Sequence, residues 1–208
     1  MELSTWIAFF AASWAISLSP GAGAVAAMSA GLQHGFARGY FMTFGLVIGI
    51  WTQVVVVVVG LGALIATSAL AFSIIKWAGV AYLIWLGVKQ WRAPATPMVA
   101  DSGDHTPVSR WTLFLRGWGV NAVNPKGTVF LLAVVPQFLD LGQPLGAQYL
   151  VIAATLGFTD LVVMAGYTVL AARLLRLLKT PRQMRALNRV FGSLFVLIGV
   201  MLATFKRA

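Results

Sequence analysis

Two charged residues, Lys126 and Asp160, lie within long apolar stretches of the sequence. A charge at the centre of a membrane-spanning helix costs roughly 2.5–3.5 kcal/mol on insertion scales, so such a residue faces the interior of a helix bundle and finds a partner there. The two residues fall at similar estimated depths, which predicts that they are neighbours. They would either form a structural ion pair or handle substrate or protons.

Two short motifs interrupt apolar stretches in the same way. Ser19-Pro20-Gly21 and Asn124-Pro125-Lys126 each place a good helix-capping residue directly before a proline, which suits the first helical position because it has no N–H to leave unpaired. Both motifs predict a helix that stops and restarts inside the membrane. Such a break persists only where it is buried in protein or lines a wet cavity. A simple proline kink in a packed helix is the alternative.

These groups together suit a zwitterion such as an amino acid. The helix ends that restart after Ser19 and Asn124 carry partial positive charge, and together with Lys126 they would attract a carboxylate, while the ammonium group would approach Asp160. A change in the protonation of Asp160 as the site opens and closes would couple transport to protons. The predicted substrate- and ion-binding residues are Ser19, Pro20, Gly21, Gln53, Asn121, Asn124, Pro125, Lys126 and Asp160.

Several polar residues near the estimated midplane have an alternative role. Each either contacts a substrate or simply hydrogen-bonds between helices. They are Thr43, Gln53, Asn121, Thr128 and Thr159.

The composition indicates a membrane protein. Of 208 residues, 60% are hydrophobic and 10% are charged, and the mean hydropathy is +0.87, whereas soluble domains carry roughly 25% charged residues. A net charge of +10 would suggest a nucleic-acid partner in a soluble protein, but here Lys and Arg lie mostly between apolar runs, as in proteins oriented in a bilayer. The lipid bilayer, and not nucleic acid, is therefore the expected partner.

The apolar runs predict the fold class: an all-α integral membrane protein with about six transmembrane helices. The predicted spans cover residues 3–37, 39–64, 69–90, 111–136, 146–172 and 187–205, with a polar cytoplasmic loop at 92–110. The first run is too long for the apolar core of a signal peptide. Residues 1–208 are expected to form one membrane transporter domain.

Three spans on each side of the loop predict an inverted 3+3 repeat, with half 1–91 and half 111–208 and one broken helix in each. Ser19-Pro20 corresponds to Asn124-Pro125 at an offset of 105 residues, and Thr52-Gln53 to Thr159-Asp160 at an offset of 107. Lys76-x-x-Gly79 and Arg189-x-x-Gly192 follow at an offset of 113. Interruptions at corresponding places in inverted repeats indicate the binding site of a transporter.

The distribution of basic residues predicts the orientation. Eleven Lys and Arg lie on the side of loop 92–110 and three on the other, which places both termini outside the cytoplasm. The basic segment 173–189 is expected to be an orienting cytoplasmic loop, with an amphipathic helix on the membrane surface as the alternative.

A set of motifs resembles the LysE/RhtB family of bacterial lysine and homoserine/threonine exporters. The motifs are Ser19-Pro20-Gly21, Gly79-x-x-Tyr82-Leu83-x-x-Leu86-Gly87, Asn121-x-x-Asn124-Pro125-Lys126, Phe130 and Pro136-Gln137-Phe138.

The resemblance implies a bacterial inner-membrane protein that exports neutral or basic amino acids, or close derivatives, driven by a proton or other ion gradient. A homodimer is one option for its assembly. Many members have a second proline after Ser-Pro-Gly, whereas this chain continues with Ala22-Gly23-Ala24, so the resemblance does not carry over the identity of the substrate.

Other function classes have little support in the sequence. No G-x-x-x-x-G-K-[ST] loop is present, so ATP would have to be hydrolysed by a partner protein. Only His34 and His105 are available for histidine chemistry and no H-E-x-x-H motif occurs, so no enzyme and no cofactor are predicted. The remaining alternative is a small cation or metal-ion exporter or channel on the same scaffold. Because cysteine is absent and only one acid lies inside a predicted span, no resident metal site is expected.

Overall fold

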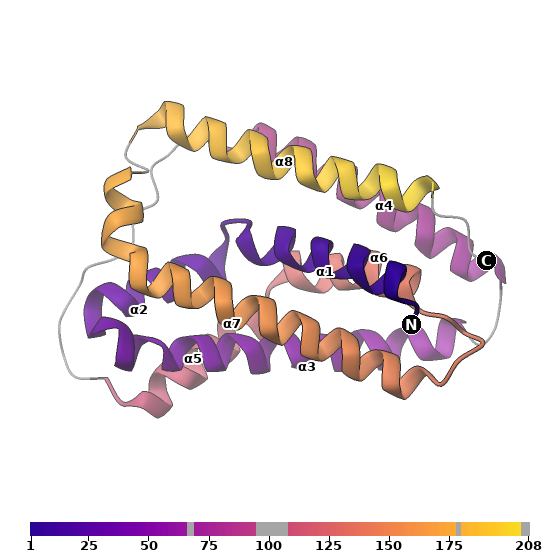
Figure 1. Cartoon of the computed structure of the whole chain (residues 1–208), viewed down its shortest axis with the longest axis horizontal. Helices are drawn as coiled ribbons and strands as arrows, with labels where there is room; N and C mark the ends of the chain where they lie inside the picture. The colour runs from indigo at the N-terminus through magenta and orange to yellow at the C-terminus, as the bar shows by residue number, and fades with distance from the viewer. Residues whose placement is uncertain (66–68, 95–107, 178–179, 205–208) are drawn as a thin grey trace.

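The computed structural model describes residues 1–65, 69–94, 108–177 and 180–204 (Figure 1). Within these ranges the chain forms α-helices and one 3₁₀-helix and no strand, so the predicted all-helical architecture is confirmed there. The elements are α1 (Leu3–Leu18), α2 (Ala22–Gly39), α3 (Phe41–Ile65), α4 (Ala69–Trp91), α5 (Arg110–Ala122), α6 (Pro125–Val134), η1 (Val135–Phe138), α7 (Leu145–Leu177) and α8 (Pro181–Thr204).

Two described helices are long and apolar enough to cross a membrane. These segments are Phe41–Gly60 of α3 and Leu145–Ala171 of α7. The pair α1 and α2, bent by 57° at the intervening break, is a third candidate when it is counted as one span. The apolar helical character of the chain therefore agrees with the sequence, while six spans in an inverted repeat stay a prediction.

The first break lies between α1 and α2. The residue before a proline is driven out of the helical region, and Ser19 accordingly has extended backbone angles (φ −69°, ψ 119°). We expected Ser19 to cap a helix that restarts at Pro20, and this detail is wrong. Gly21 is the N-cap residue, α2 begins at Ala22, and no side chain caps it. The Ser19 hydroxyl is instead a partner of Lys126.

The second break follows the prediction closely. α5 ends at Ala122, and α6 begins at Pro125 with Asn124 as its N-cap. The Asn124 side-chain oxygen accepts a hydrogen bond from the Lys126 backbone N–H at 3.1 Å. This bond satisfies a donor that the start of the helix would otherwise leave unpaired. The break at Asn124-Pro125 is therefore confirmed.

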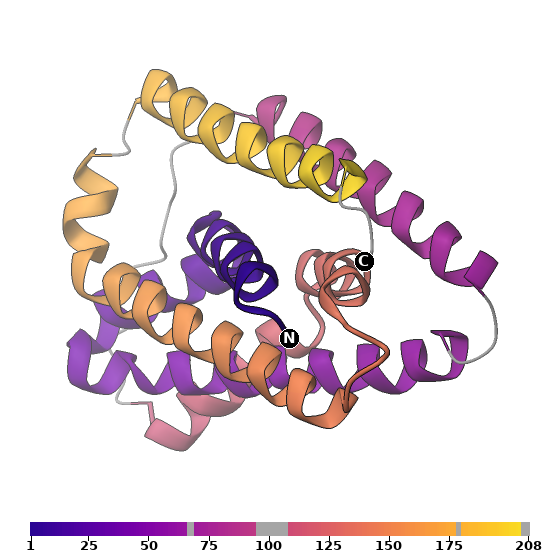
Figure 2. The same cartoon turned by 45° about the vertical axis from the view of Figure 1, so that its right-hand side comes forward.

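The broken helices bring their ends together at the middle of the bundle. Figure 2 shows α1 (indigo) and α6 (salmon) nearly end-on between two layers, with α3 and α7 on one side and α4 and α8 on the other. Phe9 of α1, Phe130 of α6 and Phe195 of α8 are almost fully buried in the same hydrophobic core. Side chains from both broken helices thus meet in the interior.

Close backbone contact fixes α5 against α3. A Cβ atom on Gly45 would come within 1.9 Å of the Phe114 carbonyl oxygen, and one on Gly117 within 2.2 Å of the Met42 carbonyl oxygen. Small residues permit this separation in membrane helices. The contact places Leu46 and Ile50 of α3 beside the second break, where both line a pocket that is described below.

Candidate functional site

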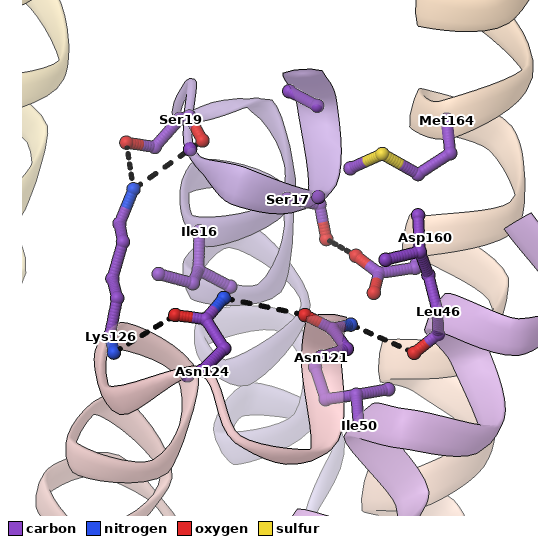
Figure 3. A pocket seen from close by; sticks show the side chains of 14 residues that line it. Ile16, Ser17, Ser19, Leu46, Ile50, Asn121, Asn124, Lys126, Asp160 and Met164 are labelled. Atoms are coloured by element: carbon purple, nitrogen blue, oxygen red, sulfur yellow. Dashed lines mark hydrogen bonds between the residues drawn. The ribbon is translucent and has the colours of Figure 1, made fainter. Parts of the chain in front are cut away.

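A cavity of about 50 Å³ lies between the two breaks (Figure 3). Glycine and apolar side chains from α1, α2, α3, α6 and α7 form part of its wall. Its polar lining consists of Ser17, Ser19, Asn121, Asn124, Lys126 and Asp160. The cavity is therefore small, polar on several sides and built from segments that are distant in the sequence.

Lys126 projects from the start of α6 to the end of α1. Its ammonium nitrogen lies 2.6 Å from the Ser19 hydroxyl oxygen, and 3.4 and 3.5 Å from the carbonyl oxygens of Ser19 and Pro20. The same nitrogen lies 5.3 Å from the centre of the Phe195 ring. The Tyr167 hydroxyl donates to the Leu18 carbonyl at 2.7 Å. The consecutive carbonyls of Leu18, Ser19 and Pro20 at the first break thus accept hydrogen bonds from side chains.

Asp160 lies on α7, across the pocket from Lys126 (Figure 3). It is 5% exposed, and one carboxylate oxygen accepts a hydrogen bond from the Ser17 hydroxyl at 2.5 Å. The Ser17 oxygen is also 3.2 Å from the hydroxyl of the buried Thr159. A buried carboxylate is therefore held at the wall of the cavity by a hydroxyl from the end of α1.

Lys126 and Asp160 share one pocket, as their similar depths predicted, but their side chains bind different partners. Each hydrogen-bonds to a different serine at the end of α1. Ser17 is still helical and meets α7, whereas Ser19 has left the helix and meets α6. Opposite charges therefore face the cavity without neutralising each other through an ion pair.

Amide side chains hold the second break. Gln53 of α3 donates from Nε2 to the carbonyl oxygens of Asn121 and Asn124, at 2.7 and 2.8 Å. Asn121 donates from Nδ2 to the Leu46 carbonyl at 2.8 Å. A Cβ atom on Gly127 would lie 2.5 Å from the Gln53 side-chain oxygen, so the first turn of α6 depends on glycine to admit Gln53.

Six of the nine predicted site residues line the cavity: Ser19, Gly21, Asn121, Asn124, Lys126 and Asp160. Pro20 and Pro125 lie at the breaks, and Gln53 supports the second break from behind. Of the alternative polar residues, Thr128 and Thr159 donate to carbonyls of their own helices, at 3.3 and 3.1 Å.

Sequence reasoning missed Ser17, which bonds to Asp160. The available signal was the spacing of Ser13 and Ser17, four residues apart on one face of an apolar helix. Ser13, however, donates to the carbonyl of Phe9 in its own helix at 2.9 Å. Spacing alone does not distinguish these two uses of a serine hydroxyl.

The described residues contain no group of three or more His, Cys, Asp and Glu side chains that could hold a metal ion. Within the pocket the acceptors are one carboxylate, hydroxyls and amides, and the Lys126 ammonium lies among them. A bundle of apolar helices with two breaks that meet at a small polar cavity is the architecture of a membrane transporter.

The chain belongs to the family of LysE type translocators, whose family model matches residues 14–205. The family resemblance drawn from the motifs is therefore confirmed, and members of this family are transporters and not enzymes.

Three relatives illustrate the similarity. The chain is 46% identical to a homoserine/homoserine lactone efflux protein of Salmonella typhimurium, over 100% of both chains. It is 42% identical to an uncharacterized membrane protein of Vibrio cholerae, over 99% of this chain and 100% of the other. It is 31% identical to a leucine efflux protein of Enterobacter sp., over 91% of this chain and 90% of the other. No solved structure matches the chain.

Proposed function

We propose that this protein exports amino acids or close derivatives from the bacterial cytoplasm by secondary active transport. The carrying observation is a pocket between two helix breaks with Lys126 on one wall and Asp160 on the other. A zwitterion complements this pocket, with its carboxylate toward Lys126 and the N-terminal end of α6, and its ammonium group toward Asp160. A substrate with only one charge would leave one of these two pocket groups without an opposite charge.

The size of the cavity supports a transport cycle with more than one state. A volume of about 50 Å³ has room for only a few water molecules, at about 10–15 Å³ each by the same measure. An amino acid therefore requires the walls to separate. The first break separates α1 from α2, and the second separates α5 from α6. Relative movement of these half-helices would therefore widen the pocket without unwinding a helix.

We expect cells or vesicles that contain the protein to release preloaded amino acids faster than those without it. The related homoserine/homoserine lactone and leucine efflux proteins make homoserine, its lactone and leucine the first compounds to test, with lysine for the basic class. Radiolabelled compounds, followed with and without the protein, provide the measurement. Release of inorganic cations but of no amino acid would favour the alternative, a cation exporter or channel.

Asp160 is the proposed coupling group. It is a buried acid in the pocket, so it can exchange a proton for the ammonium group of a substrate as access changes from one side to the other. Collapse of the proton gradient should then slow efflux of preloaded substrate. Coupling to another ion would leave the rate independent of the proton gradient at a fixed membrane potential.

The contacts of Gln53 and Asp160 support the proposed inverted repeat. These residues correspond at an offset of 107 in the sequence. Gln53 of α3 binds the break between α5 and α6, and Asp160 of α7 binds the end of α1 at the other break. Each half thus contributes a polar side chain to the broken helix of the other. The third correspondence has no such support, since Gly79 faces α6 and Gly192 faces α4.

We predict an inner-membrane location with both termini outside the cytoplasm and the basic segment 173–189 inside. The chain has no cysteine, so single cysteines at Ser102, which lies outside the described residues, and at the C-terminus can be probed with an impermeant thiol reagent in intact cells. Only the terminal cysteine should react before the cells are lysed. Reaction at position 102 and not at the terminus would reverse the orientation. A homodimer also stays a prediction.

A further inference from the structure

The ammonium group of Lys126 lies among four cation-attracting groups at the end of α1. Its closest partner is the Ser19 hydroxyl at 2.6 Å, the carbonyl oxygens of Ser19 and Pro20 lie at 3.4 and 3.5 Å, and the Phe195 ring centre is 5.3 Å away. Carbonyls at the C-terminal end of a helix carry partial negative charge, and an aromatic face attracts an ammonium ion. The acceptors belong to the first break and α8, whereas the cation comes from α6.

This set of acceptors suits a primary ammonium group. Three oxygens match its three N–H donors, and the two carbonyls accept hydrogen bonds but have none to donate. An anion would be repelled by the same carbonyls. The site therefore suits a primary ammonium group whether or not that group is attached to α6.

Lys126 can leave this position when a carboxylate enters the pocket. Its flexible four-carbon stem permits the ammonium group to turn, and a hydrogen bond to a carboxylate is stronger than one to a neutral carbonyl. Departure of Lys126 would leave the Ser19 and Pro20 carbonyls without their donor inside the membrane, which is costly. The ammonium group of a zwitterionic substrate is chemically equipped to replace it.

We propose that the end of α1 is an ammonium-binding subsite, which Lys126 fills in this conformation and which the amine of the transported molecule fills when Lys126 turns to the carboxylate. The identity of the second occupant rests on the proposed function, whereas the existence of the subsite does not. Asp160 on the opposite wall is then the other position for the substrate ammonium group. The substrate would move between the two positions during transport.

The subsite can be tested by removing the Lys126 side chain and supplying a free amine in its place. Purified Lys126→Ala protein should be stabilised by ethylammonium chloride, with a rise in the thermal unfolding midpoint of at least ~3 °C at saturation, because the amine binds the folded state alone. Sodium chloride at equal ionic strength is the baseline. Tetramethylammonium, which has no N–H donor, should give no such rise.

Two matched variants identify the site of action. Lys89→Ala removes an exposed lysine whose ammonium group lies 4.7 Å over the Trp85 ring, and it should respond to ethylammonium no more than the unmodified protein does. Adding Ser19→Ala to Lys126→Ala should raise the half-maximal ethylammonium concentration at least ~5-fold, because the closest acceptor is lost. An equal response in all variants, or none in Lys126→Ala, would overturn the proposal.

The test also works when Lys126→Ala is unstable without a ligand. Ethylammonium present during solubilisation should then recover monodisperse protein, and aggregation despite the amine counts against the subsite. The outcome is separate from the transport assay: absence of amino-acid efflux with intact amine stabilisation would reject the proposed function alone. Efflux without amine stabilisation would reject the subsite alone.

Discussion

Asp160→Asn protein is expected to fold but to lose at least ~30-fold of its substrate efflux, because losing one partner of a buried charge interaction costs roughly 2–5 kcal/mol. The asparagine side chain keeps an oxygen that can accept the hydrogen bond from Ser17, so the contact between α1 and α7 is preserved. The negative charge that would face the substrate ammonium group, and the exchangeable proton, are removed. Efflux of preloaded radiolabelled substrate, normalised to the amount of folded protein, is the measurement.

Asp140→Asn is the matched control for this change. Asp140 is exposed in the turn before α7, where its carboxylate accepts a hydrogen bond from the Gly142 N–H at 2.9 Å. The same chemical substitution there should leave efflux near that of the unmodified protein. Near-normal efflux by well-folded Asp160→Asn would refute the proposed role of the pocket carboxylate.

The double variant Asp160→Asn with Lys126→Met separates two interpretations of the pocket charges. A purely structural ion pair would predict that the double change restores efflux that either single change removes, because no lone charge remains. The two residues have separate serine partners, so we expect the double variant to fold and stay inactive. Recovery of efflux would indicate that the two charges only compensate each other and do not bind the substrate.

The positions of the breaks could be predicted because proline acts locally. Pro20 drives Ser19 into an extended conformation, and Pro125 follows a residue that caps helices well. The cap of α2 could not be predicted in the same way. The Ser19 hydroxyl could either cap α2 or bind another side chain. It binds the ammonium group of Lys126, which comes from a distant segment of the sequence.

The separate serine partners of Lys126 and Asp160 could not be predicted for a related reason. Span boundaries estimate how deep a residue lies in the membrane, but they do not give the direction of its side chain around the helix. Packing sets that direction, here through the close contact of α3 with α5 and the break that bends α2 by 57° from α1. The sequence therefore predicted most of the polar residues that line the pocket, but not the partner of each.

Gln53→Leu is expected to destabilise the protein and abolish efflux. The substitution removes the amide donor to the Asn121 and Asn124 carbonyls, which keep their backbone hydrogen bonds from the Asn124 and Thr128 N–H groups, at 3.0 and 3.1 Å. Each hydrogen bond lost costs roughly 0.5–1.5 kcal/mol. Gln53 is 2% exposed, so water has little access to replace it. With these bonds lost, the second break keeps the hydrogen bond from Asn121 to the Leu46 carbonyl of α3, but the start of α6 and Lys126 are held less firmly. Thermal unfolding and efflux of preloaded substrate measure the two effects.

Gln148→Leu distinguishes general loss of stability from damage to the pocket. Gln148 is also 2% exposed, and it exchanges hydrogen bonds with the Asp140 backbone at 2.8 and 2.9 Å, in the segment that leads into α7. Its replacement should lower the unfolding midpoint yet leave measurable efflux, because the pocket lining is untouched. Gln53→Leu should give no efflux even at a temperature where equal fractions of the two variants are folded. Equal efflux from both would mean that Gln53 only holds helices together and that the geometry of the second break does not control transport.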